Sequence, residues 1–203
     1  MHERILNEIE AKIRIYPGYA DLTNQMGILL MKGGDLKDAK RHFLKALQLN
    51  PDYQEARLNL GFLYIGERRW KEVEEVFLSE SGRNRKNGFL QHVLGLCYLR
   101  IAKRQEAEVQ IRKAIRLCPS YREFYPKRGA WRKGAGHLSQ EAEKALDRIR
   151  TDYQETHFRN FVGLYLAQQG KFSQAIRELR RATGIQPDQA LFHSNLGTVH
   201  YPR

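Results

Sequence analysis

The residues best suited to metal binding or nucleophilic catalysis are seven histidines and two cysteines. Cys97 and Cys118 form no CxxC pair, and no histidine pair accompanies them at zinc-ligand spacing. We expect both cysteines to act as small apolar fillers in contacts between helices. The histidines are scattered without the spacing of a metal site: His2, His42, His92, His137, His157, His193 and His200. The sequence therefore predicts no metal and no cofactor.

Motifs that bind phosphate or activate a serine are also missing. The chain has neither a GxxxxGK[ST] loop nor a GxSxG elbow. Gly134-Ala135-Gly136 is too short for a dinucleotide loop and lacks a preceding strand pattern. We therefore predict that the chain is not an enzyme, although it could be the recognition arm of a larger one.

Positive charge is concentrated in the middle of the chain. The net charge is +12, and residues 83–150 hold 17 Lys and Arg against six Asp and Glu. We define a basic patch by eight of these residues: Arg83, Arg85, Lys86, Arg122, Lys127, Arg128, Arg132 and Lys133. Such a field attracts acidic proteins or phosphate backbones, but it is also compatible with an ordinary solvated surface.

Aromatic residues interleave with the second half of the basic patch: Tyr121, Phe124, Tyr125 and Trp131. Aromatic and basic residues together can bind single-stranded nucleic acid by stacking and charge neutralisation. No recognition-helix, RNP or zinc-finger signature accompanies them. We favour core packing of these aromatics, with an acidic protein as a more plausible partner than nucleic acid.

Composition indicates a globular, helix-rich chain of 203 residues that is 41% hydrophobic and 29% charged. It contains no apolar stretch of about 18 residues, so no membrane span is predicted. The first residues alternate charged and apolar side chains and lack the features of a signal peptide. We accordingly expect a cytoplasmic protein.

A period of 34 residues organises the whole chain. Six glycines share this spacing: Gly27, Gly61, Gly95, Gly129, Gly163 and Gly197. Pro17, Pro51, Pro119 and Pro187 lie on the same grid. Such a fixed period is the mark of a repeat architecture, in which each unit buries its apolar face against the next.

Each unit shows two amphipathic segments of about a dozen residues, because apolar residues recur at three- and four-residue spacing. In the first unit these helices are expected at 20–32 and 36–49, separated by the turn Gly33-Gly34-Asp35, which can reach left-handed dihedrals. Gln169-Gly170-Lys171 repeats this turn in the fifth unit. A glycine kept inside the first helix predicts that the second helix presses closely against it.

The array resembles the tetratricopeptide repeats, whose 34-residue unit has a small residue at position 8, Ala at 20 and 27, a large apolar residue at 24 and Pro at 32. Phe43 and Phe77 occupy position 24, and Ile111 and Leu179 do so later. The resemblance implies an all-α solenoid, a right-handed superhelix of stacked antiparallel helix pairs. It gives five full repeats with a half-repeat at each end: 1–19, 20–53, 54–87, 88–121, 122–155, 156–189 and 190–203.

Two repeats depart from the family pattern. Repeat 2 has Arg85 where the proline is expected, and its second helix is predicted to dissolve into SGRNRKNG. Repeat 4 has Pro126 inside its first helix, so we expect a distorted helix pair broken or shortened there. Its second helix is expected from Ser139 to about Asp152.

In this family the first helix of each repeat lines a concave groove, and positions 2, 5, 9, 12 and 13 contact partner peptides. We call the surface formed by these positions the helix-A face. The resemblance maps fourteen residues onto it: Asn24, Ile28, Met31, Glu55, Leu58, Phe62, Ile65, Phe89, His92, Leu96, Leu99, Arg100, Asn160 and Leu164. Lys32 stands at another such position. These residues are predicted to bind a protein or peptide segment, or alternatively to pack within a tightly closed solenoid.

Family members that hold acidic chaperone C-termini use a clamp of Lys and Asn residues on this face. At the corresponding positions the chain has Asn24, Ile28, Asn59, Phe89 and Val93, and only Asn59 matches. A clamp of that kind is therefore not expected in repeats 1 to 3.

The two unpaired end helices further predict a longer array or self-association through those ends.

Overall fold

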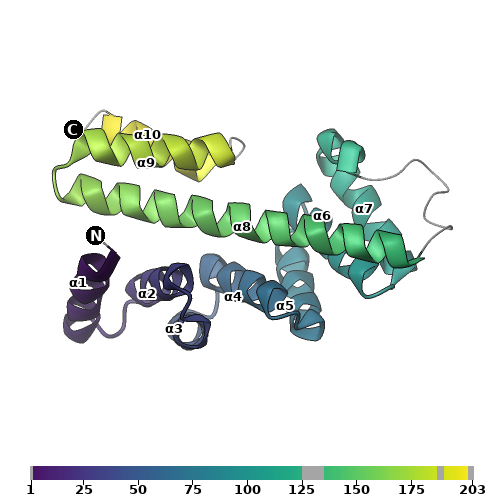
Figure 1. Cartoon of the computed structure of the whole chain (residues 1–203), viewed down its shortest axis with the longest axis horizontal. Coiled ribbons are helices and arrows are strands. Elements are labelled where there is room, and N and C mark those ends of the chain that lie inside the picture. Colours follow the sequence, from purple (N-terminus) through teal and green to yellow (C-terminus); the bar gives the residue numbers. More distant parts are fainter. Residues whose placement is uncertain (1, 125–134, 187–189, 201–203) are drawn as a thin grey trace. The chain divides into compact units, whose positions relative to one another are not determined.

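The structure is a computed structural model that describes residues 2–124, 135–186 and 190–200. Every regular element within these ranges is helical (Figure 1). In chain order they are α1 (His2–Ile15), α2 (Ala20–Gly33), α3 (Leu36–Leu49), α4 (Gln54–Gly66), α5 (Trp70–Arg83), α6 (Gly88–Arg100), α7 (Arg104–Leu117), the 3-10 helix η1 (Pro119–Phe124), α8 (Ala135–Gln168), α9 (Phe172–Ile185) and α10 (Ala190–His200).

The helices follow the 34-residue grid. The first helices of successive repeats begin at Ala20, Gln54, Gly88 and Ala190, and the second helices begin at Leu36, Trp70, Arg104 and Phe172. The all-α solenoid built of helix pairs is thereby confirmed over the described residues. Because these starts are set by a repeated pattern of apolar and small residues, the sequence located them closely.

The turns inside the helix pairs share one backbone conformation. Gly34 and Gly170 have φ of 90° and 72°, as the glycine-containing turns predicted. Arg68 and Ala102 occupy the same place in repeats 2 and 3 with φ of 59° and 61°. A left-handed conformation is unfavourable for residues with a Cβ, so these two turns are strained relative to the glycine turns.

The glycine inside the first helix allows the second helix to approach closely. An ideal Cβ built on Gly95 would lie 2.7 Å from Cγ1 of Ile111, and one on Gly163 would lie 2.6 Å from Cγ of Leu179. Gly27 and Gly61 are similarly crowded by the aromatic side chain that follows them 16 residues later. The predicted packing role of these glycines is confirmed.

The second helix of repeat 2 does not dissolve as predicted. This helix is α5, which runs to Arg83. Its length of 14 residues equals that of the second helices of repeats 1 and 3. Asn84 ends it by donating its backbone N–H to the carbonyl of Glu80. The prediction was wrong because a helix can end without a proline, so Arg85 in place of the proline does not disrupt α5.

The predicted end of a helix near Asp152 is also wrong. α8 continues for 34 residues through the boundary between repeats 4 and 5. Tyr153 stands where other repeats have proline, and Thr156 satisfies its hydroxyl by donating to the Asp152 carbonyl at 2.7 Å. No residue in this stretch interrupts the helix. The expected break near Pro126 lies outside the described residues.

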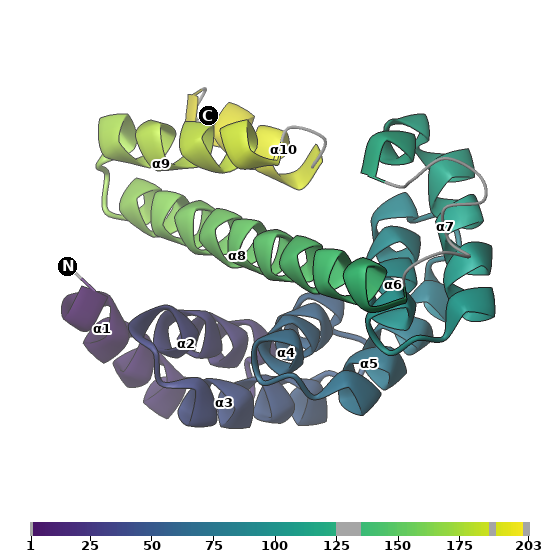
Figure 2. The same cartoon turned by 45° about the vertical axis from the view of Figure 1, so that its right-hand side comes forward.

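The chain folds into two compact modules. The terminal module contains Met1–Asn59 and Thr151–Arg203, and the central module contains Leu60–Arg150. Within the terminal module, the second half of α8 lies between α1 and α2 on one side and α9 and α10 on the other (Figures 1 and 2). An apolar core joins these five helices, with Ile9, Leu29, Val162, Leu179 and Val199 among its buried members.

Candidate functional site

Most of the fourteen residues predicted on the helix-A face are buried. Nine have little exposure: Asn24, Ile28, Met31, Leu58, Phe62, Ile65, His92, Leu96 and Leu99. Five are half-buried: Glu55, Phe89, Arg100, Asn160 and Leu164. The face is therefore largely covered in this conformation. This agrees with the alternative prediction that these residues pack within the solenoid.

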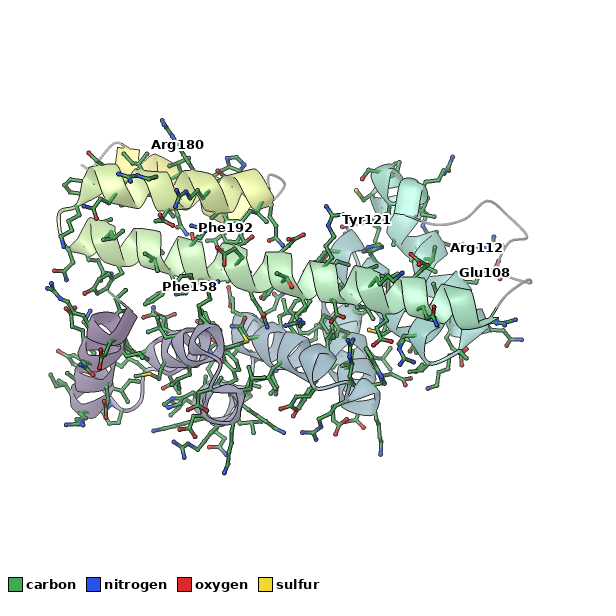
Figure 3. The ribbon with its side chains drawn as sticks, viewed as in Figure 1. Glu108, Arg112, Tyr121, Phe158, Arg180 and Phe192 are labelled. Carbon is green, nitrogen blue, oxygen red and sulfur yellow. The ribbon has the colours of Figure 1, made fainter. Side chains whose placement is uncertain are left out.

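In the terminal module, α8 covers the helix-A face of α2. Nε2 of Gln154 lies 3.1 Å from Sδ of Met31, and Lys32 forms an ion pair with Glu155. Nζ of Lys32 also lies 5.3 Å from the centre of the Phe158 ring, which is labelled in Figure 3. The hydrogen bond from Lys32 lowers the pKa of Glu155. The contacts of Lys32 with Glu155 and Phe158 thus help to hold α8 against α2.

Asparagines link neighbouring first helices in two equivalent places. Asn59 donates to the side-chain oxygen of Asn24 at 2.9 Å, and Asn195 donates to Asn160 at the same distance. Both pairs are 35 residues apart in sequence, so they repeat one position of the array. Asn59, the single match to the chaperone-binding clamp, is therefore engaged within the chain.

In the central module, aromatic residues connect the face to the core. Phe62 packs edge to face with Phe77 at 5.3 Å and lies 6.3 Å from Phe89, measured between ring centres. His92 stacks on Tyr121 at 4.4 Å with an interplanar angle of 3°. Burial lowers the pKa of His92 to about 4, so the ring is neutral at pH 7. These side chains support the fold as well as lining the face.

Two arginines and a tryptophan form a cluster in the central module. The guanidinium carbons of Arg68 and Arg100 lie 5.9 and 5.1 Å from the ring centre of Trp70. Both arginines form ion pairs with Glu143 of α8, and Arg68 also binds Asp147, with both Arg68 contacts at 2.9 Å. We call Arg68, Trp70 and Arg100 the arginine clamp.

Sequence reasoning found only Arg100 of this clamp. Arg68 lies in the turn and Trp70 begins the second helix, so neither belongs to a position that the family resemblance marks. One signal was available: arginine stands at the turn position where repeats 1 and 5 have glycine. A residue that tolerates left-handed backbone poorly is worth inspection in such a place.

The basic patch is described only in part. Arg83, Arg85, Lys86 and Arg122 are exposed, whereas Lys127, Arg128, Arg132 and Lys133 lie outside the described residues. Of the interleaved aromatics, Tyr121 is stacked on His92. Tyr125 and Trp131 lie outside the described residues, and the side chain of Phe124 is not described. The proposed role of this patch in binding nucleic acid or acidic protein stays a prediction.

The described residues include two free cysteines. Cys97 is buried and Cys118 is half-buried, both as free thiols, and burial raises the pKa of Cys97. No helix in the described ranges is long and apolar enough to cross a membrane.

Comparison with known families agrees with the repeat grid. A tetratricopeptide repeat model matches residues 30–87, and a TPR repeat model matches residues 163–201. The chain is a tetratricopeptide-repeat protein. The first match runs from the end of α2 to the end of α5, and the second covers the end of α8, α9 and α10. The regular helix starts carry the same pattern through the described part of the array.

Solved structures show the same fold for this tetratricopeptide-repeat chain. MamA from Desulfovibrio magneticus RS-1 is 17% identical, with coverage of 93% of this chain and 88% of that one and a TM-score of 0.54. YrrB, described as a TPR protein with an unusual peptide-binding site, is 22% identical, with coverage of 92% and 96% and a TM-score of 0.53. A tetratricopeptide repeat protein from Parabacteroides merdae is 15% identical, with coverage of 98% and 78% and a TM-score of 0.52. No curated protein sequence matches.

Proposed function

We propose that this chain is a protein-interaction scaffold whose helix-A face binds a segment of another protein. The observation that carries the proposal is the way α8 is held on this face in each module. In the terminal module apolar residues such as Leu29 and Val162 make the central contact, and the pair of Lys32 with Glu155 flanks it. In the central module, Arg100 of the face pairs with Glu143 of α8. A partner helix of similar character would meet the same complementary surface. The peptide-binding site named for YrrB adds support by analogy of fold.

The half-buried residues of the face are the appropriate place to test binding. Phe89, Asn160 and Leu164 retain partial exposure and lie outside the fully buried core. Phe62, in contrast, is fully buried against Phe77, and its truncation would cost about 3–5 kcal/mol of folding stability. Loss of binding by a Phe62 variant would therefore not distinguish recognition from unfolding.

The test begins with selection of binding peptides from a displayed peptide library against the full chain. Affinities are then measured by isothermal titration calorimetry for the wild type and for Phe89→Glu. We expect at least about a tenfold loss for Phe89→Glu, because a charge would be placed in the apolar contact. Leu78→Glu is the matched control, since Leu78 is 48% exposed on α5. Its affinity should equal that of the wild type.

Two results would contradict the proposal. If no library yields a peptide that binds, the chain is not a scaffold of this kind. If the selected peptides lose affinity with Leu78→Glu but not with Phe89→Glu, the binding surface is the outer side of the second helices.

A further inference from the structure

We propose that the arginine clamp is a recognition site for a protein helix carrying two acidic side chains four residues apart. The first half of α8 occupies this site in the structure, and an acidic helix of a partner competes with it. This inference rests on the proposed scaffold function and specifies the chemistry of the partner. It is distinct from the chaperone-binding clamp, whose positions the chain does not match apart from Asn59.

The geometry of the clamp suits two carboxylates on one face of a helix. Glu143 binds both arginines, and Asp147, one helical turn later, binds Arg68. Trp70 lies beside both guanidinium groups and restricts where they can point. Glu143 alone would leave Nη2 of Arg68 without the carboxylate that Asp147 provides, so a second acid one turn later completes the recognition of Arg68.

Arg68 lies in the left-handed turn between α4 and α5. Its φ of 59° is the conformation that glycine provides in the turns of repeats 1 and 5. An arginine adopts it only against a steric cost. Ala102 adopts the same conformation at the equivalent turn of repeat 3, so the repeat geometry imposes it on either side chain. Here the strained turn directs the guanidinium group towards Glu143 and Asp147.

The bound part of α8 has the pattern of a helix docked through one face. Ala142 and Leu146 are buried, and Ala145 and Ile149 are half-buried, at the spacing of an apolar stripe. Glu143 and Asp147 flank this stripe. The sequence of the natural occupant therefore gives a concrete template for the partner: small and branched apolar residues with acids at two adjacent turns.

The ionic contacts are suited to exchange rather than to permanent closure. The Arg68 side chain is 45% exposed and that of Arg100 is 30% exposed. Ion pairs with such exposure are screened by water and salt, so they contribute little to folding. Because α8 is tethered, it competes with a free partner at a high effective concentration. Weakening its acids should therefore strengthen binding of an external helix.

The experiment uses a fluorescent peptide with the sequence of residues 140–155 and the full chain, with fluorescence anisotropy as the readout. In Glu143→Lys/Asp147→Lys the reversed charges repel Arg68 and Arg100, so the site is vacated. We expect this variant to bind the peptide at least about ten times more tightly than the wild type. A peptide with the same two acids changed to lysine should not bind it.

A charge swap identifies the residues that read the peptide. Arg68→Glu/Arg100→Glu in the otherwise unchanged chain repels Glu143 and Asp147 and also vacates the site. This variant should bind the lysine-containing peptide and not the native peptide. Glu141→Lys is the matched control, because Glu141 lies on the same helix with 51% side-chain exposure and pairs with Lys144. It should bind like the wild type. If circular dichroism shows that the reversal unfolds the chain, Glu143→Gln/Asp147→Asn should give the same order of affinities.

Absence of peptide binding in every variant, or affinity that is unchanged by Arg68 and Arg100 substitutions, would overturn the assignment. The outcome is separable from that of the scaffold test. Library peptides that depend on Phe89 would keep the scaffold function while the clamp fails, and failure of both would remove the scaffold as well.

Discussion

His92 and Arg68 both depart from the behaviour that their residue types favour in isolation. His92 is only 3% exposed and stacks on Tyr121, so a residue predicted to face a partner belongs mainly to the fold. Arg68 holds a left-handed backbone that glycine would adopt without strain. The sequence indicated where both residues stand in the repeat, but their contacts come from η1 and α8, which the repeat pattern does not position.

His92 makes the stability of the chain depend on pH. Burial lowers its pKa in the folded state to about 4, below the unfolded value of about 6.5. The unfolded state therefore binds the proton first as the pH falls. The neutral, buried His92 contributes its full stabilisation above about pH 6.5. As the pH falls to about 4, the free energy of unfolding decreases by about 3 kcal/mol.

Urea unfolding at about pH 7 and about pH 4.5 measures this effect. In His92→Phe, which keeps an aromatic ring beside Tyr121, the loss of stability between these two pH values should be smaller by about 2–3 kcal/mol than in the wild type. An identical pH dependence for His92→Phe and the wild type would show that His92 does not titrate in this way.

At the scale of helices, the sequence predicted boundaries well wherever the residues themselves supply the signal. Gly34 turns the chain, and the starts at Leu36 and Phe172 follow glycine turns of the same kind. The expected end near Asp152 came from the register alone, since Tyr153 replaces the proline and no glycine turn follows it. The helix continues because nothing in the stretch stops it. Register without a breaking residue is thus a weak signal for an end.

Two glycines at the same repeat position should respond in opposite ways to alanine. Gly95→Ala gains about 1 kcal/mol in helix propensity but places a Cβ 2.7 Å from Cγ1 of Ile111, which costs about 1–3 kcal/mol. We expect a net loss of about 1 kcal/mol. Gly197→Ala meets no atom within 4 Å, so it should gain up to about 1 kcal/mol.

Both variants can be compared with the wild type by urea unfolding. The result that matters is the difference between them, because the helix-propensity contribution is common to both. Equal effects on the free energy of unfolding would mean that the contact with Ile111 does not restrict this position.

For the molecule as a whole, the family pattern predicted which residues form the helix-A face but not that this face is covered. The covering contacts join residues far apart in sequence, such as Lys32 with Glu155, 123 residues later. A repeat pattern describes each unit and its neighbour, so it carries no information on such long-range closure. The long α8, which arises from the missing stop near Tyr153, supplies the segment that Lys32 binds in the terminal module and Arg100 binds in the central module.

The covered face explains why a scaffold of this kind would need a partner of defined chemistry. An external segment gains only the difference between its own contacts and those that α8 gives up. Partners without acidic residues to engage Arg68 and Arg100 lack one of the contributions that α8 makes. Discrimination among partners then follows from competition with the chain's own helix.

Hydrogen–deuterium exchange of the full chain, with and without saturating peptide 140–155, tests this competition directly. The account predicts faster exchange of backbone amides in the first half of α8 when the peptide is bound, because that segment leaves the arginine clamp. Amides of α6 should be at least as protected as before. Unchanged exchange of α8, together with new protection confined to α3 or α7, would contradict the assignment of the helix-A face as the binding surface.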